Sequence, residues 1–122
     1  MTSNSTTPGN PATLKIRFPF KGGFYAFQPD QIIRLEADSN YTFIHVRDRK
    51  PILMAKVLSA YESLLAPFGF IRTHRSHLVN SLHINAVDHS GQIIMDDNSV
   101  AELSRRKRKT VYRMLIQNDS AA

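Results

Sequence analysis

Short runs of alternating hydrophobic and polar residues make up most of this chain. An alternation with a period of two places successive side chains on opposite faces of a β-strand. The runs are rich in β-branched and aromatic residues, which favour strands, and turn-forming pairs such as Gly22-Gly23 and Asp97-Asn98 separate them. The pattern predicts strands over residues 14–18, 24–27, 32–36, 41–47, 51–54, 70–73, 77–80, 84–89, 92–95 and 99–103.

Two segments follow a helical period instead. Over residues 55–65 the apolar side chains recur at i, i+1, i+4, i+7 and i+8, and Pro67 and Gly69 end the pattern. The predicted buried stripe consists of Val57, Leu58, Tyr61, Leu64 and Leu65. Ser104 is placed to cap a second helix that runs to Ile116. Its predicted apolar face consists of Val111, Met114 and Leu115. Many short strands and few helices together predict a mostly-β domain.

The length of 122 residues is sufficient for one domain. Residues 1–13 are rich in Ser, Thr, Asn and Pro, and we expect them to form a disordered leader or linker. The folded domain is predicted over residues 14–117, with a frayed C-terminus over 118–122. The chain has no cysteine, which excludes disulfides and thiolate metal sites and is typical of a reducing, cytoplasmic location. Its apolar runs are far shorter than the roughly 20 residues that span a membrane.

The net charge of +6 comes from one segment. The chain has 16 basic and 10 acidic residues, and residues 104–116 hold no acid and six of the bases: Arg105, Arg106, Lys107, Arg108, Lys109 and Arg113. The other ten bases balance the ten acids. Cations at the start of a helix oppose the helix dipole, so helix stability does not account for them. The segment therefore predicts an anionic partner. A nucleic acid, an acidic protein or membrane surface, and a solvated basic face remain open at this point.

Two further polar clusters are candidates for ligand contact. Residues 72–80 combine arginine, histidine, serine and asparagine, which bind phosphate oxygens or base edges, and Arg75 is the best placed to face a ligand. The alternative is a polar connection whose side chains hold the local backbone. Asn40 and Tyr41 end the polar turn after the strand over 32–36, where they could contact a base or simply form the turn and the core.

Catalytic and metal-binding readings of the second cluster find little support. His74 and His77 lie three residues apart, which in a strand or turn places them on opposite faces, and no thiol or carboxylate nearby completes a metal site. Ser76 lies beside them, but no nucleophile elbow or acidic partner accompanies it. The sequence therefore predicts no catalytic residue, no metal and no cofactor, and hence not an enzyme.

The three clusters, in this order, resemble one protein family. Residues 33–46, 70–80 and 103–106 match the LytTR (LytR/AlgR-type) DNA-binding domain of bacterial transcription regulators, and the resemblance covers residues 14–116. Its most specific element is Phe70-x-Arg72-x-His74-Arg75-Ser76-x-x-Val79-Asn80. The resemblance implies small stacked antiparallel sheets with one or two short helices. It also implies that loops, rather than a recognition helix, enter successive major grooves.

Site residues follow from the same resemblance and from charge. The resemblance implies DNA base contacts by Asn40, Tyr41, Arg75 and Arg105. Contacts with DNA phosphates, or scaffold roles, are expected for Arg72, His74, Ser76, Asn80 and Ser104, which lie in the matching stretches, and on charge for Arg106, Lys107 and Lys109.

The function expected from these residues is sequence-specific binding of double-stranded DNA as the output domain of a bacterial response regulator or related transcription regulator. The resemblance implies paired direct repeats as the target and two copies head-to-tail on the DNA. The 13 residues before the domain are too few for a phospho-receiver, so we expect either a fragment or a stand-alone regulator. A stand-alone regulator would be controlled by a separate protein, by its expression level or by a ligand. The alternatives are an RNA-binding β module, which exposed aromatic side chains would favour, and a protein-interaction module whose basic helix docks on an acidic partner. The Phe and Tyr residues fall mostly at positions predicted to be core.

Overall fold

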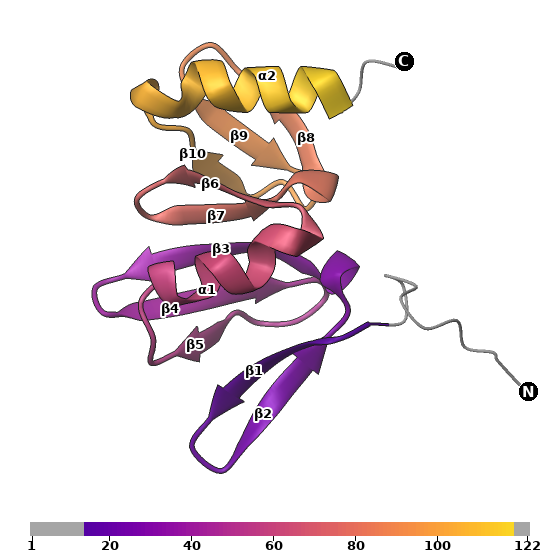
Figure 1. The fold of residues 1–122 in the computed structure, drawn as a ribbon, viewed down its shortest axis with the longest axis vertical. Helices are drawn as coiled ribbons and strands as arrows, with labels where there is room; N and C mark the ends of the chain where they lie inside the picture. The colour runs from indigo at the N-terminus through magenta and orange to yellow at the C-terminus, as the bar shows by residue number, and fades with distance from the viewer. Residues whose placement is uncertain (1–13, 119–122) are drawn as a thin grey trace, which may run out of the picture.

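Ten strands form three separate antiparallel sheets in the computed structural model, which describes residues 14–118 (Figure 1). The first sheet is a hairpin of β1 (Ile16–Phe20) and β2 (Gly23–Phe27). The central sheet has the order β5-β4-β3-β7-β6, from β3 (Ile32–Asp38), β4 (Tyr41–Val46), β5 (Ile52–Met54), β6 (Phe70–His74) and β7 (His77–Asn80). The third has the order β10-β9-β8, from β8 (Ile84–Val87), β9 (Gln92–Met95) and β10 (Val100–Glu102).

Two helices complete the described structure, α1 (Ser59–Leu65) and α2 (Arg108–Asn118). The three sheets and the helices follow one another along the long axis of the molecule, so the layers appear in chain order from bottom to top in Figure 1. This confirms the predicted fold class, a mostly-β domain of small stacked antiparallel sheets with two short helices. Every predicted strand is present, and no end differs from the prediction by more than two residues.

Strands β3, β6 and β7 of the central sheet are buried on both faces by two separate hydrophobic clusters. Ile32, Leu35 and Leu78 pack into the cluster that includes β1, β2, β4, β5 and α1. Ile33 and Val79 pack into the cluster that includes β9, β10 and α2. Because side chains alternate along a strand, neighbours such as Ile32 and Ile33 serve opposite clusters. The sheet therefore joins the two halves of the domain.

The first helix is shorter than the sequence predicts. It begins at Ser59 rather than near residue 55, because the hydroxyl of Thr42 donates to the carbonyl oxygen of Lys56 at 2.7 Å and holds residues 55–57 outside the helix. As a result only part of the predicted stripe is buried. The buried members are Leu58, Tyr61 and Leu65, whereas Val57 and Leu64 are exposed.

The second helix also differs from its prediction. A 3₁₀ turn occupies Arg105–Lys107, and α2 follows from Arg108. On its apolar face Val111 is buried and Leu115 is partly buried, but Met114 is exposed. Residues 1–13 and 119–122, which include the predicted leader and most of the predicted frayed end, lie outside the described residues. No helix among residues 14–118 is both long and apolar enough to cross a membrane.

Asn80 ties the two hairpins of the central sheet together at their shared end. Its side chain is fully buried. The amide nitrogen donates to the carbonyl oxygens of Pro29 and Ile32, at 3.0 and 2.9 Å, and the amide oxygen accepts from the backbone N–H of Leu82 at 3.1 Å. This side chain therefore replaces backbone hydrogen bonds where the chain enters β3 and leaves β7.

Replacing Asn80 with alanine is expected to destabilise the domain by about 2–4 kcal/mol, because two buried carbonyl groups and one partly buried N–H lose their partner. Urea unfolding followed by circular dichroism measures this change. Asn85→Ala, at an exposed position on β8, is the matched control and should change stability by less than about 0.5 kcal/mol. Equal effects of the two substitutions would contradict the role assigned to the buried amide.

Candidate nucleic-acid interface

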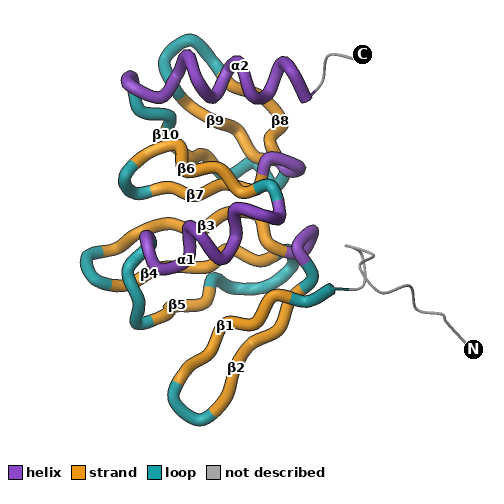
Figure 2. The backbone as a smooth tube through the Cα atoms, in the orientation of Figure 1, coloured by secondary structure: helices purple, strands orange, loops and turns teal. Residues whose placement is uncertain are grey.

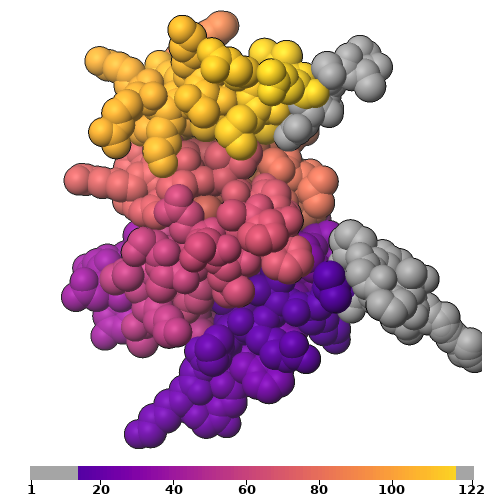
Figure 3. Space-filling view, viewed as in Figure 1, coloured from indigo at the N-terminus to yellow at the C-terminus, as the bar shows by residue number. Residues whose placement is uncertain are grey.

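Three connections lie at the same edge of the molecule, on the left in Figures 1 and 2. They are the β3–β4 turn, the β6–β7 turn, and the segment over residues 104–107 that leads into α2. Figure 3 shows side chains projecting from this rim at each of the three levels. Because β3 pairs with β7, the first two turns are tips of neighbouring hairpins in one sheet. We call these three segments the turn edge.

Arg72 holds the β6–β7 turn from within. Its Nε donates to the carbonyl oxygen of His74 at 2.9 Å, and one terminal nitrogen donates to that of Arg75 at 2.6 Å. The other terminal nitrogen forms an ion pair with Glu62 of α1 at 2.7 Å. The guanidinium is thus occupied by the turn and by α1, which leaves it in a scaffold position rather than free for a phosphate.

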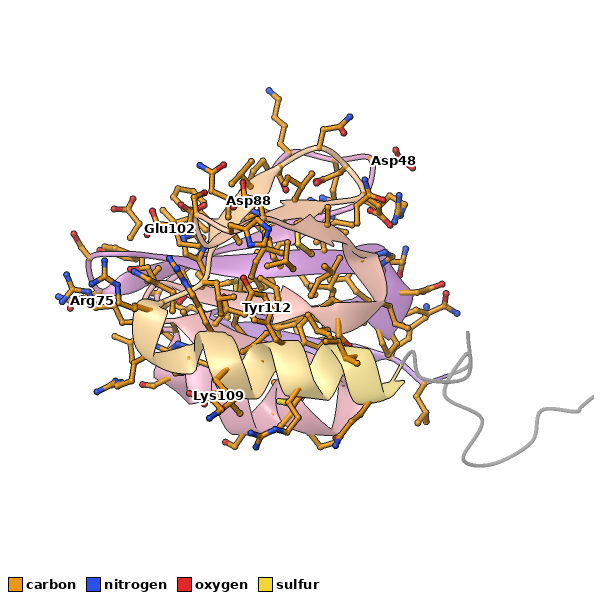
Figure 4. All side chains as sticks on the ribbon, turned by 90° about the horizontal axis from the view of Figure 1, so that it is seen from above. Asp48, Arg75, Asp88, Glu102, Lys109 and Tyr112 are labelled. Atoms are coloured by element: carbon orange, nitrogen blue, oxygen red, sulfur yellow. The ribbon has the colours of Figure 1, made fainter. Side chains whose placement is uncertain are left out.

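Arg75 stands at the tip of the turn that Arg72 holds. Its side chain is exposed and makes no hydrogen bond or ion pair with any described residue. Figure 4 shows it extending into solvent at the side where α2 begins, with Asp48 at the opposite side of the molecule. The backbone of the turn is therefore fixed, while the side chain of Arg75 is free to contact a partner.

His74 and Ser76 flank Arg75 and complete the turn. The backbone N–H of Ser76 donates to Nδ1 of His74 at 3.0 Å, and the Ser76 carbonyl oxygen accepts from the N–H of Ala37 on β3 at 2.9 Å. Nε2 of His74 lies 3.3 Å from the carboxylate of Glu102. These contacts place both residues in the support of the turn, and they link it to the neighbouring hairpin.

The segment over residues 104–107 is fastened to β6. The N–H of Ser104 donates to the carbonyl oxygen of Thr73 at 2.8 Å, and the Thr73 hydroxyl donates to the carbonyl oxygen of Glu102 at 2.8 Å. The amine of Lys107 donates to the carbonyl oxygen of Arg72 at 3.0 Å. The backbone that carries Arg105 is therefore held in a fixed relation to the turn that carries Arg75.

The six cations of the basic segment divide into two kinds. Lys107 and Arg108 are partly buried and hydrogen-bonded to the backbone of other elements. The side chains of the other four are exposed and make no hydrogen bond or ion pair within residues 14–117: Arg105, Arg106, Lys109 and Arg113. In Figure 4, Lys109 lies on the outer side of α2, whereas Tyr112 points toward the sheets.

Arg108 fastens α2 to the β8–β9 turn. Its guanidinium donates to the carbonyl oxygens of His89 and Ser90, at 3.4 and 2.9 Å. Gly91 makes this approach possible, because a Cβ there would lie 2.9 Å from the carbonyl oxygen of Leu103 and closer still to the guanidinium. Gly91 also has a φ of +90°, which glycine adopts without strain.

Ser104 does not cap the helix with its side chain as predicted. It occupies the N-cap position of the 3₁₀ turn in an extended conformation, but its hydroxyl is buried and makes no hydrogen bond with any described residue. Its contribution comes from the backbone, where its carbonyl oxygen accepts from the N–H of Lys107 at 3.0 Å.

The β3–β4 turn presents Asn40 and Tyr41 to solvent. Ser39 has a φ of 56° and makes the tight reversal, after which Asn40 is exposed and Tyr41 is 48% exposed. The alternative that Tyr41 belongs to the core is therefore wrong. Both side chains are free of hydrogen bonds to described residues. Asn80, in contrast, is fully buried, so of the two roles expected for it only the scaffold role fits its position.

The two histidines of the cluster lie side by side, contrary to the prediction of opposite faces. The hairpin pairs His74 with His77 across β6 and β7, and their ring centroids are 5.6 Å apart. The prediction failed because it treated the segment as one continuous strand. No group of three or more His, Cys, Asp or Glu residues in the described part of the chain has the geometry of a metal site.

Sequence reasoning missed the supports of the turn edge. Glu62 and Glu102 come from two other elements, α1 and β10, and contact Arg72 and His74 of the turn only after folding. The sequence also did not predict a hydrogen-bonded network around Arg34. Arg34, almost fully buried on β3, donates to the carboxylate of Glu36 at 3.0 Å and to the Ser99 hydroxyl at 3.1 Å. No local pattern marks these residues, because their partners lie up to 65 positions away.

The local environment behind the turn edge lowers the pKa values of Glu36, His45 and His77. Partial burial works to raise the pKa of Glu36, but hydrogen bonds from Arg34 and His45 and the charge of Arg34 outweigh it, so that pKa lies below its usual 4.5. Burial lowers the pKa of His45 and of His77 below the usual 6.5, and the charge of Arg34 acts in the same direction. Nδ1 of His77 is buried without a hydrogen-bond partner among the described residues.

Comparisons with known proteins agree with this fold. A family model described as the LytTr DNA-binding domain matches residues 22–116. Among solved structures, a LytTr DNA-binding domain from Bacillus cereus is similar at 24% identity with a TM-score of 0.65, and the match covers 85% of this chain and 97% of that one. At this identity the structural likeness shows the fold alone. No curated protein matches the sequence.

Stability is expected to fall as pH falls through about 6.5, because the unfolded chain then takes up protons that folded His45 and His77 resist. His77→Gln should reduce the loss between about pH 7.5 and 5.5 without abolishing it, since His45 remains. Urea unfolding at the two pH values measures the change. His89→Gln, at an exposed position, should leave the loss unchanged. An unaltered pH dependence in His77→Gln would contradict the assignment.

Proposed function

Since this chain belongs to the LytTR DNA-binding domain family, we propose that it binds double-stranded DNA sequence-specifically as part of a bacterial transcription regulator. The turn edge supports this proposal best. It brings Arg75, Arg105 and the Asn40-Tyr41 pair to one side of the molecule on backbone that is hydrogen-bonded in place. The family description names DNA binding and no catalytic activity.

In this proposal, the free side chains of the turn edge contact the DNA bases. An arginine side chain forks onto O6 and N7 of guanine, and an asparagine pairs with N6 and N7 of adenine. We assign these roles to Arg75, Arg105 and Asn40, with Tyr41 beside Asn40 for base or backbone contact. All four are exposed and unpartnered within the described chain, so binding need not break existing contacts.

In the same proposal, the exposed cations around these base-contacting side chains bind the DNA phosphates. Arg106, Lys109 and Arg113 are free to neutralise phosphates, which supplies affinity without sequence information. Lys107 and Arg72 are assigned to scaffold roles because their hydrogen bonds hold the turn edge together. His74, Ser76, Asn80 and Ser104 are scaffold by the same reasoning.

The spacing of the turns bears on how the DNA is approached. Strands lie about 4.8 Å apart, so the two hairpin tips are about 10 Å apart and the whole edge spans about 15–20 Å. Successive major grooves on one face of straight B-DNA are about 34 Å apart. Reaching two of them therefore requires extended arginine side chains and a duplex that bends toward the protein.

One copy reads few bases, so we propose that the target is a pair of direct repeats, each bound by one copy in a head-to-tail arrangement. A few contacted base pairs do not separate one site from a genome of competitors. A separate regulatory protein would supply the signal, in a cytoplasmic setting.

Exposed aromatic side chains are more numerous than the sequence predicted. Phe20, Phe24 and Tyr41 are exposed, but only Tyr41 lies on the turn edge. Phe20 and Phe24 belong to the β1–β2 hairpin, and the guanidinium of Arg17 lies 5.6 Å from the Phe24 ring centroid. They do not form a stacking platform beside the basic segment, so duplex DNA is favoured over single-stranded RNA. Competition between a duplex pool and single-stranded RNA tests this choice directly.

Arg75→Ala and Arg105→Ala are each expected to weaken specific binding by about 1–3 kcal/mol, with the loss concentrated at one base position. Selection from a random duplex pool supplies the site, and titration of its single-base variants by fluorescence anisotropy locates the loss. Lys109→Ala is the matched control and should weaken all sequences alike. Uniform losses for both arginine variants would reassign them to phosphate contact.

Binding is also expected to depend steeply on salt. The three cations assigned to phosphate contact, Arg106, Lys109 and Arg113, neutralise about three phosphates per copy, so affinity should fall roughly 40-fold between about 50 and 200 mM salt. The slope of log affinity against log salt concentration measures the number of counterions released from the DNA. A flat response would rule out phosphate neutralisation and favour the protein-interaction alternative.

A further inference from the structure

A groove of about 450 Å³ separates the β1–β2 hairpin from β5 and the start of α1. Phe20 and Leu53 form its walls, and they remain 46% and 53% exposed. Two large apolar side chains exposed along one groove form a contiguous apolar patch, which is more informative than single exposed residues. The groove has the volume of a site for a small molecule, and it belongs to neither the turn edge nor the basic segment.

Tyr61 is one of the residues that line this groove, and its hydroxyl is buried without a partner among the described residues. Tyr61 is only 2% exposed, yet its hydroxyl makes no hydrogen bond with any described residue. A buried polar group without a partner costs stability, so its retention calls for an explanation. Burial raises the pKa of Tyr61, which keeps the hydroxyl protonated and able to donate a hydrogen bond.

Two lysines complete the lining. Lys21 comes from the β1–β2 turn and Lys56 from the loop before α1. Both are exposed, and neither amine makes a hydrogen bond or ion pair with a described residue. A residual charge imbalance accompanies them. Residues 14–31 and 47–56 together hold seven bases and two acids, and one of the bases, Arg47, is paired with Asp96 from outside these ranges. The remaining excess of bases favours an anionic ligand at this groove.

We propose that this groove binds a small organic anion with an apolar body, such as an aromatic or short-chain carboxylate. The body packs between Phe20 and Leu53, the Tyr61 hydroxyl donates to one carboxylate oxygen, and the two lysines neutralise the charge. A DNA phosphate would use the lysines but not the apolar walls or the buried hydroxyl, so the lining favours the organic anion.

Phenylacetate is the probe, followed by ¹H–¹⁵N NMR on the full chain. Saturable shifts are expected for backbone amides of residues 20–21, 53–56 and 61, with a dissociation constant on the order of 1 mM or below. Phenylacetamide, of the same shape but neutral, and inorganic phosphate, without an apolar body, should each bind more weakly. No saturable shift, or equal binding of either comparison compound, would overturn the proposal.

Variants locate the interaction. Tyr61→Phe keeps the ring and removes a hydroxyl that has no partner, so the fold should persist while phenylacetate binding weakens roughly 2- to 10-fold. The double change Lys21→Gln and Lys56→Gln should weaken it by a similar, salt-sensitive factor of roughly 3 to 10. Tyr112→Phe is the control, because Tyr112 lies on α2, remote from the groove, and this substitution should leave phenylacetate binding unchanged.

Other occupants give distinct results in the same experiment. A duplex that shifts the groove amides and displaces phenylacetate would assign the lysines to DNA and overturn the proposal. Shifts of the groove amides with protein concentration alone would show that a second copy covers the groove, which also overturns it. Because the groove lies apart from the turn edge, loss of DNA binding in Arg75→Ala with phenylacetate binding intact separates this proposal from the proposed function.

Discussion

Burial of β3, β6 and β7 on both faces of the central sheet is the constraint on which the rest of this structure depends. Neighbouring residues such as Phe70 and Ile71, or Leu78 and Val79, serve opposite hydrophobic clusters. A slip of one residue in the pairing of β7 with β3 or β6 would exchange these sets and disrupt both clusters at once. The register of the hairpins, and with it the position of each turn at the edge, is therefore fixed by packing deep inside the domain.

Polar contacts at the ends of the sheets then fix the positions of the surface turns relative to this core. Asn80 closes one end of the central sheet with three hydrogen bonds, while Arg72 and Lys107 hold its other end and join it to the last segment of the chain. Arg108 does the same for the third sheet through the β8–β9 turn. Basic residues that look equivalent in the sequence therefore have different roles. Those that are hydrogen-bonded to the backbone of other elements support the fold, whereas the exposed ones are free to contact a partner.

The sequence was sufficient to predict the strands and the fold class, because alternation with a period of two is a local property that survives folding. It was also sufficient to identify the two segments that carry Arg75 and Arg105 as candidates for ligand contact. Helix starts were predicted less well. Thr42, on a distant strand, decides where α1 begins, and no local pattern at residues 55–58 reveals that. His74 and His77 were misplaced because a hairpin reverses the chain between them. The supporting partners Glu62 and Glu102 reach the turn only through tertiary contact.

The clamp formed by Arg72 has a kinetic consequence. Its hydrogen bonds to the carbonyl oxygens of His74 and Arg75 fix the backbone of the turn before any partner arrives. Only the rotamers of the exposed side chains then remain to be ordered when a partner docks, and the entropy cost of docking is correspondingly small. Association should therefore be governed by diffusion and long-range attraction rather than by a slow rearrangement of the protein, and discrimination between partners should reside in how long each complex lasts.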